Sequence, residues 1–162
     1  MADASIFTDR ERAFLRELIR RDVDFMIVGL AAAALQGAPA VTQDIDLWFR
    51  DLAEPRLREA LKKVGGVYVP PTASTPPMLA GKSVALFDIV LTMHGLGDFD
   101  EEIENAIEVR IGRMKVKALS LERIIASKRA ENREKDRLVL PVLEDAAAVL
   151  RDRRSRQPPD RK

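Results

Sequence analysis

The chain has no cysteine and a single histidine, His94. The absence of cysteine excludes disulfide bonds, thiolate metal sites and a cysteine nucleophile. A single histidine excludes a zinc site with several histidine ligands, and a serine–histidine catalytic pair would have to use His94. His94 follows a predicted strand in a turn, where a structural or exposed position is the commoner one. Polar chemistry in this chain therefore rests on Asp, Glu, Lys and Arg.

Aromatic residues make up only 5% of the sequence, so aliphatic side chains must dominate the core. No stretch approaches the ~20 apolar residues that a membrane-spanning helix needs. Residues 1–12 contain no apolar segment typical of a signal peptide. With 162 residues, 46% hydrophobic and 33% charged, the sequence predicts one soluble globular domain. We expect a cytoplasmic protein of bacterial type.

The net charge of +1 is unevenly distributed along the chain. Residues 151–162 carry six basic and two acidic side chains, whereas the preceding 150 residues carry a net charge of −3. We therefore predict a folded domain over residues 1–150 and a disordered, solvated basic tail over residues 151–162. Contact of this tail with an RNA backbone is the alternative. An acidic body is not typical of a dedicated nucleic-acid-binding domain.

Helical and strand patterns are mixed along the chain. Thr8 and Glu11 form a capping-box pattern that predicts a first helix, and Gly112 marks the turn of a hairpin over residues 108–119. The other predicted elements are helices at 30–35, 51–64, 98–107, from 120 onward and 135–150, strands at 25–28, 42–49, 67–69 and 83–93, and a loop at 70–77. This mixture indicates an α/β or α+β fold around one mixed sheet.

Two aspartates, Asp44 and Asp46, lie in the predicted strand 42–49. Alternate side chains of a strand share a face, so both carboxylates point the same way, ~7 Å apart. Two carboxylates at this spacing can converge on one or two hard cations. The alternative is that both aspartates lie on the solvated side of an edge strand.

A third aspartate, Asp88, interrupts the apolar run over residues 84–91. An ionised carboxylate inside such a strand needs a compensating partner: a basic side chain, backbone donors or a metal ion. If this strand lies beside strand 42–49, three carboxylates gather, and Mg²⁺ is the natural cation for oxygen-only ligands. An ordinary salt bridge is the alternative.

Two further residues are candidates for phosphate binding. Gly29 stands where a strand ends and a helix begins, a junction that offers free backbone N–H groups, although a packing role explains it equally well. Lys128 lies on the apolar stripe of the helix that begins at Ser120, from which it either extends to solvent or reaches a phosphate. Arg133, Lys135 and Asp136 are predicted to form surface ion pairs.

Together these segments resemble the minimal nucleotidyltransferases of the polymerase-beta-type superfamily. The segments that carry the resemblance are residues 26–29 (MIVG), 42–47 (TQDIDL), 87–90 (FDIV), 119–128 (LSLERIIASK) and 133–136 (REKD). The last two are similar to the downstream part of small proteins related to the AbiEii toxins. The likeness covers residues 20–145 and implies a mixed sheet flanked by helices.

The resemblance also implies a function, the transfer of a nucleoside monophosphate from a nucleoside triphosphate to an acceptor hydroxyl with release of pyrophosphate. Asp44 and Asp46 would hold two Mg²⁺ ions, and Asp88 would bind one of them and help to deprotonate the acceptor. The nucleotide-binding residues implied in this way are Gly29, Leu30, Thr42 and Lys128. The acceptor stays open between RNA ends, a protein hydroxyl and a small molecule such as an antibiotic.

The sequence departs from the family pattern at Leu30, where relatives usually have Gly or Ser. A histidine near Gln36 and an arginine near Ala40, frequent in relatives, are also absent. Two alternatives to an active nucleotidyltransferase stand, and the departures favour the first of them. One is a catalytically inactive binding module of the same fold, such as one half of a toxin–antitoxin-like pair with a protein partner. The other is a D-x-D glycosyltransferase, for which 162 residues leave little room.

Overall fold

The computed structural model of the protein describes residues 7–157. Its helices are α1 (Asp9–Arg20), α2 (Gly29–Leu35), α3 (Pro55–Lys63), α4 (Phe99–Glu102), α5 (Leu121–Glu131) and α6 (Glu134–Arg156), with short 3₁₀ helices η2 (Lys82–Val84) and η3 (Ile103–Asn105). The strands are β1 (Phe25–Val28), β2 (Ile45–Phe49), β3 (Val67–Val69), β4 (Met78–Ala80), β5 (Phe87–Val90), β6 (Ala106–Ile111) and β7 (Met114–Leu119).

Five strands form one mixed sheet in the order β5-β2-β1-β7-β6. Strand β2 runs antiparallel to β1 and parallel to β5, while β7 runs parallel to β1 and antiparallel to β6. All four residues of β1 are buried, so this central strand has apolar side chains on both faces. The predicted mixed α/β fold with helices flanking the sheet is confirmed.

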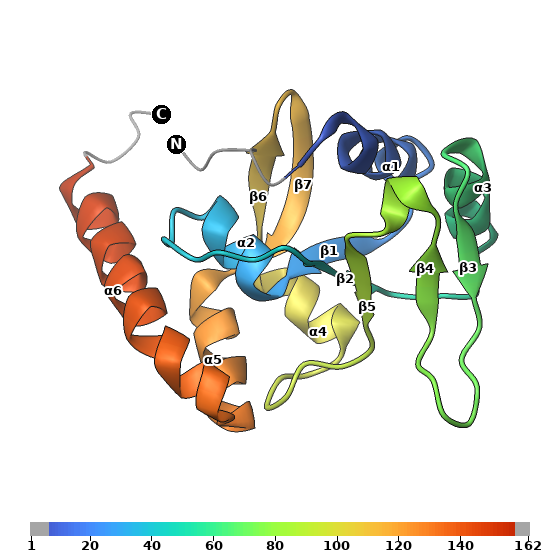
Figure 1. Ribbon diagram of the computed structural model, residues 1–162. Coiled ribbons are helices and arrows are strands. Elements are labelled where there is room, and N and C mark those ends of the chain that lie inside the picture. The colour runs from blue at the N-terminus through green and yellow to red at the C-terminus, as the bar shows by residue number, and fades with distance from the viewer. Residues whose placement is uncertain (1–6, 158–162) are drawn as a thin grey trace.

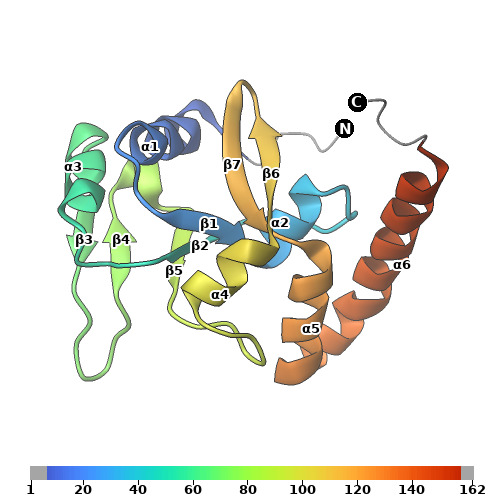
Figure 2. The same ribbon diagram turned by 180° about the vertical axis from the view of Figure 1, so that it is seen from behind.

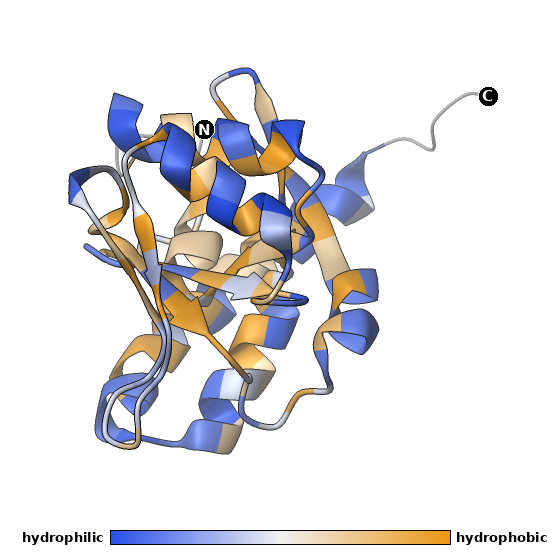
Figure 3. Cartoon of the chain, turned by 90° about the vertical axis from the view of Figure 1, so that its right-hand side faces the viewer, coloured by the Kyte–Doolittle hydropathy of each residue, from blue (hydrophilic) through white to orange (hydrophobic). Residues whose placement is uncertain are grey.

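Helices cover the sheet on both sides (Figure 1, Figure 2). In Figure 1, α2 lies in front of β1, and in the reverse view of Figure 2 α4 lies in front of the sheet. Helices α5 and α6 pack against each other beside the sheet. Figure 3 shows hydrophobic residues along the central strands and hydrophilic residues on the outer sides of the helices. Among the buried side chains, Trp48 packs edge-on against Phe99, with 5.8 Å between ring centroids.

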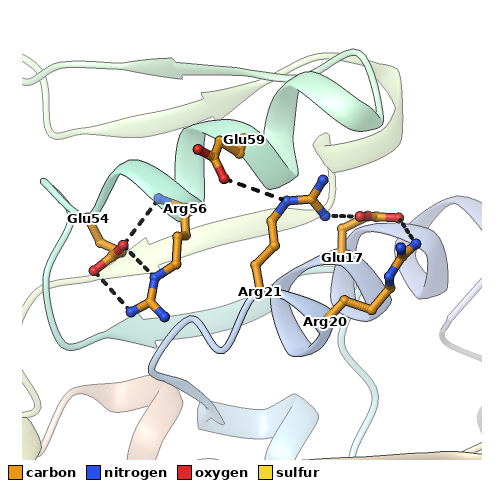
Figure 4. Close-up of polar contacts among 6 residues, drawn as sticks. All are labelled: Glu17, Arg20, Arg21, Glu54, Arg56 and Glu59. Carbon is orange, nitrogen blue, oxygen red and sulfur yellow. Dashed lines mark hydrogen bonds and ion pairs between the residues drawn. The ribbon is translucent and has the colours of Figure 1, made fainter.

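Away from the α5–α6 pair, β3 and β4 form a separate two-stranded sheet, and the predicted loop 70–77 joins them. Charged side chains link the neighbouring helices α1 and α3 (Figure 4). Glu17 accepts hydrogen bonds from Arg20 at the end of α1 and from Arg21, the residue that follows it, and Arg21 Nε lies 4.0 Å from Glu59 Oε2 on α3. The Arg21–Glu59 pair, whose glutamate side chain is exposed, contributes little stability, so apolar contacts must hold α1 and α3 together.

Several predicted boundaries differ from the structure. The strand predicted at 83–93 divides into η2 and the four-residue β5, because a continuous apolar run carries no period that separates strand from helix. The predicted hairpin at 108–119 is confirmed as β6 and β7. The predicted domain boundary at residue 150 falls inside α6, where Arg156 pairs with Asp152 one turn earlier at 3.3 Å. Residues 158–162 of the predicted tail lie outside the described residues. Within residues 7–157, no helix is both long and apolar enough to cross a membrane.

Candidate active site

The three aspartates singled out by the sequence meet at the β2–β5 edge of the sheet. Asp46 lies directly opposite Asp88 in the parallel register of β2 and β5, so both side chains project from the same face. Asp44 precedes the first residue of β2, one position before Ile45. All three line a cavity of about 370 Å³, which is hereafter called the aspartate cavity. Its other lining residues are Leu30, Thr42, Lys128, Arg133, Lys135, Asp136 and Val139.

The structure corrects two expectations about these aspartates. Asp44 does not belong to the strand; the side chain of Thr42 holds it instead, donating to the Asp44 carbonyl at 2.9 Å and accepting from the Asp44 N–H at 3.3 Å. Asp88 was expected inside a buried strand, but it is exposed. The physical reason is topological, because β5 is an edge strand of the five-stranded sheet.

Electrostatics within the aspartate cavity favour a bound cation. Burial raises the pKa of Asp46, and the neighbouring charges of Asp88 and Asp44 raise it further, while Lys128 and Lys135 oppose the shift. Partial desolvation of its carboxyl, although the residue is exposed, and the charge of Asp44 likewise raise the pKa of Asp88. A raised carboxyl pKa means that the ionised form is disfavoured, and a nearby cation removes that penalty.

Gly29 is required by the position of Asp46. Its φ of +67° is a left-handed conformation that side chains disfavour. A Cβ atom at this position would lie 2.4 Å from Oδ2 of Asp46, well inside the contact distance. Gly29 therefore allows the Asp46 carboxylate to lie directly against the backbone at the start of α2.

Basic side chains from the α5–α6 junction also line the aspartate cavity. Lys128, on α5, has its Nζ atom 3.4 Å from Oδ1 of Asp136. Arg133 Nε donates to Oδ2 of the same carboxylate at 2.8 Å. Asp136 is only 1% exposed, which corrects the expectation of a surface ion pair at this junction.

A second, smaller cavity of about 200 Å³ adjoins the first and shares Asp46, Lys128 and Arg133 with it. Gly29 and the exposed His94 also line this cavity. All the candidate residues from the sequence are thus brought together: Leu30, Thr42, Asp44, Asp46, Asp88 and Lys128 around the aspartate cavity, and Gly29 in the adjoining one. Trp48, in contrast, is buried in the core and lines neither cavity.

Sequence reasoning missed the part that Gln36 plays. Its Nε2 atom donates to the carbonyl of Leu119 at 2.8 Å, and its Oε1 atom accepts from the N–H of Leu121 at 2.8 Å. Gln36 therefore ties the end of α2 to the point where β7 leads into α5. A glutamine after a short helix gives no sequence signal of this kind, because its partners lie more than 80 residues away.

The donor chemistry of the aspartate cavity fits Mg²⁺. Within residues 7–157, no three Asp, Glu, His or Cys side chains enclose a metal position by themselves. Proteins usually hold Mg²⁺ with one or two carboxylates, completed by waters and substrate phosphates. Asp44, Asp46 and Asp88 offer oxygen ligands of this kind, with a mutual repulsion that a divalent cation relieves.

The five-stranded mixed sheet flanked by helices is that of the nucleotidyltransferase fold. Residues 8–151 match the family described as "Nucleotidyl transferase of unknown function (DUF2204)", and the chain belongs to this family. The comparison with curated proteins found no match.

Two solved structures of ANT(2'')-Ia are similar to this chain. A crystal structure of it in complex with adenylyl-2''-tobramycin is 17% identical, with a TM-score of 0.57, and the alignment covers 88% of this chain and 95% of that one. A solution structure, described as that of an antibiotic-resistance factor, is 17% identical with a TM-score of 0.58 over 90% of this chain and 91% of that one. At this level of identity the likeness establishes the fold alone.

Proposed function

We propose that this protein transfers a nucleoside monophosphate from a nucleoside triphosphate to an acceptor hydroxyl, with Mg²⁺ as cofactor and pyrophosphate as the leaving group. One observation carries the proposal. In a chain of the nucleotidyltransferase family, Asp44, Asp46 and Asp88 line one cavity and face the basic side chains of Lys128 and its neighbours. This arrangement suits a substrate with a chain of phosphates.

The carboxylates of Asp44, Asp46 and Asp88 would hold up to two Mg²⁺ ions, which supply charge stabilisation for the entering and leaving oxygens of an in-line displacement. The chain's own groups do the rest. Asp88, which lies opposite Asp46 in the sheet register and lines the same cavity, is suited to accept the proton of the acceptor hydroxyl as that oxygen attacks the α-phosphorus. Lys128 contacts the phosphate chain, and Gly29 leaves room for Asp46 beside the backbone.

Leu30 supports a second candidate function. Its side chain lines the aspartate cavity and brings no hydroxyl to a position where relatives usually have Gly or Ser. A catalytically inactive member of the fold, resembling AbiEii-related proteins and acting on a protein partner in a toxin–antitoxin-like pair, would bind nucleotide or partner without releasing pyrophosphate.

Calorimetric titration with the four nucleoside triphosphates tests the proposal without an acceptor. Wild type is expected to bind at least one of them more tightly with Mg²⁺ than without it. Asp44→Ala should weaken this Mg²⁺-dependent binding by more than about 100-fold, because the loss of indirect partners of a metal already weakens binding by roughly 10- to 100-fold. Glu108→Gln, which removes an exposed acid of β6 at the opposite edge of the sheet, is the control.

Binding that survives in Asp44→Ala, or that needs no metal, contradicts the proposed site. Binding in wild type without pyrophosphate release in the presence of RNA, protein and small-molecule acceptors favours the inactive alternative. Absence of binding in wild type indicates that Leu30 closes the cavity to nucleotides, and the partner-binding function then takes precedence.

A further inference from the structure

Two basic side chains that face the aspartate cavity share one buried carboxylate. Besides Lys128 and Arg133 Nε, Asp136 accepts a hydrogen bond from Arg133 Nη2 at 3.2 Å and from the Arg133 backbone N–H at 3.1 Å. The side chain of Lys128 is itself only 15% exposed. Two of the three cations that line the cavity are therefore held by one almost fully buried carboxylate.

The local sequence explains why the carboxylate lies there. Asn132 adopts a left-handed conformation with a φ of 50° and ends α5, so that the chain turns at once into α6. Arg133 is the residue before the first turn of α6, and the carboxylate of Asp136, three positions later, accepts a hydrogen bond from the Arg133 backbone N–H at 3.1 Å and so caps this helix start. One carboxylate thus caps α6 and receives both cations.

Asp136 remains charged under all ordinary conditions, because its hydrogen bonds with Arg133 lower its pKa to about 2. Lys128 lies within electrostatic range of two carboxylates, Asp136 and Asp46, and it lowers the pKa of each. If the charge of Asp136 is removed, Asp46 is the carboxylate left to attract this ammonium group. A lysine held on Asp46 competes with a metal ion for the same oxygens.

Other elements around the cavity offer little to a phosphate chain. Helix α2 is only seven residues long, and Leu30 presents an aliphatic side chain in its first turn. The remaining basic lining residue is Lys135, which is exposed and forms no ion pair with any residue between 7 and 157. Anion recognition in the cavity therefore rests on the α5–α6 junction.

We propose that Asp136 is a positioning residue for nucleotide binding. Its buried carboxylate fixes the Lys128 ammonium and the Arg133 guanidinium as a pair facing the aspartates and keeps Lys128 away from Asp46. This inference rests on the proposed function, since it assigns the phosphate-binding groups of the same site. Asp136 itself contacts no substrate.

The test uses Asp136→Asn, which preserves the shape of the side chain and an acceptor for the Arg133 backbone N–H but removes the charge. The probe is inorganic tripolyphosphate with Mg²⁺, followed by Mg²⁺ alone, in calorimetric titrations. Asp136→Asn is expected to weaken tripolyphosphate binding by roughly 10- to 100-fold, as the loss of a supporting group does at other metal and phosphate sites. The matched control is Glu102→Gln, which neutralises a second buried acid that is paired with a cation of α5 outside the cavity.

A double-mutant cycle with Lys128→Met separates positioning from a general loss of structure. If Asp136 acts through Lys128, Asp136→Asn costs much less affinity in the Lys128→Met background than in wild type. For Mg²⁺ alone the two single variants are expected to move in opposite directions, with weaker binding in Asp136→Asn and tighter binding in Lys128→Met. A protein that is merely less stable does not give this pattern.

The outcomes distinguish this inference from the proposed function. Tight binding of tripolyphosphate by wild type and Asp136→Asn alike overturns the positioning role and leaves the proposed function intact. Equal losses in Asp136→Asn and Glu102→Gln also overturn it, since they show that stability alone is responsible. No binding by wild type overturns the nucleotide site and the positioning role together. If Asp136→Asn does not fold, Lys128→Met and Arg133→Gln must each weaken binding for the proposal to stand.

Discussion

A buried acid lies near each end of helix α5: Glu102, the last residue of α4, near its start, and Asp136 of α6 beyond its end. The two acids serve different purposes. Near the start of the helix, Glu102 is 2% exposed and accepts hydrogen bonds from Arg123 Nε at 2.9 Å and Nη2 at 2.6 Å. Beyond the end, Asp136 receives Lys128 and Arg133. Hydrogen bonds from an arginine lower the pKa of both acids.

Glu102 and Asp136 differ in their surroundings and not in their chemistry. Glu102 also accepts from the N–H of Gly97 at 3.1 Å and thus ties the loop before α4 to α5, while neither Glu102 nor Arg123 lines a cavity of the candidate site. Asp136 lines the aspartate cavity itself. Burial, ion pairing and a lowered pKa are therefore common to a purely structural acid and one beside a binding site, and position relative to the cavity decides between them.

The largest expected effect is on stability, and both acids should show it. Removal of one partner from a buried ion pair leaves the other charge uncompensated, so Asp136→Ala is expected to lower the free energy of unfolding by about 3 kcal/mol. Glu102→Ala should lower it by about 2 kcal/mol, because the partly exposed Arg123 can turn to solvent. Urea denaturation at neutral pH measures both values. If Glu102→Ala, at a temperature where it is folded, also loses nucleotide binding, the distinction between a purely structural Glu102 and a binding-site Asp136 is wrong.

The aspartates of the site could be found from the sequence because their context is local. Asp44 and Asp46 alternate beside apolar neighbours, and Asp88 interrupts an apolar run, so residue type and spacing marked each of them as a candidate but left open whether they share a site. The strand order that brings Asp88 beside Asp46 was suggested by the family resemblance. The fold class followed in the same way from the mixture of helix and strand patterns.

The basic residues of the site, at the α5–α6 junction, could not be predicted from local sequence patterns in the same way. The burial of Asp136 depends on the turn at Asn132 and on the packing of α6 against α5, neither of which has a periodic signature. An acidic residue in the first turn of a predicted helix was the one available signal for Asp136, but charged residues at a helix start are usually solvated. For the same reason the edge position of β5, and with it the exposure of Asp88, required the tertiary structure.

The second expected effect is on acid stability. A carboxyl whose pKa is lowered in the folded state contributes stability that is present above its unfolded pKa and is lost as the pH falls through its folded pKa. For Asp136 this window runs from about 3.8 down to about 2. Asp136→Asn should therefore reduce the dependence of unfolding free energy on pH in this window by up to about 1.4 kcal/mol per pH unit. Thermal unfolding followed between pH 2 and 4.5 measures the slope. An unchanged slope contradicts the charged state assigned to Asp136.

The smallest expected effect concerns Asp46, an acid whose pKa is raised rather than lowered. Folding disfavours its ionised form, so the charge lowers stability at neutral pH, and this penalty disappears at acidic pH where the carboxyl is protonated in the folded state. Asp46→Asn is therefore expected to stabilise the metal-free protein at pH 7 by about 0.5 kcal/mol.

Without metal, Asp46→Asn is expected to be more stable than wild type, and addition of Mg²⁺ should make wild type the more stable of the two. A cation bound by Asp46 stabilises only the folded wild type, so the melting temperature of wild type rises with Mg²⁺ concentration while that of Asp46→Asn changes little. Scanning calorimetry, first with a chelator and then with increasing Mg²⁺, measures the melting temperatures of wild type and Asp46→Asn. Destabilisation by Asp46→Asn without metal would place Asp46 with Glu102 and Asp136, as an acid retained for the fold, and would remove the electrostatic argument for a cation at the aspartates.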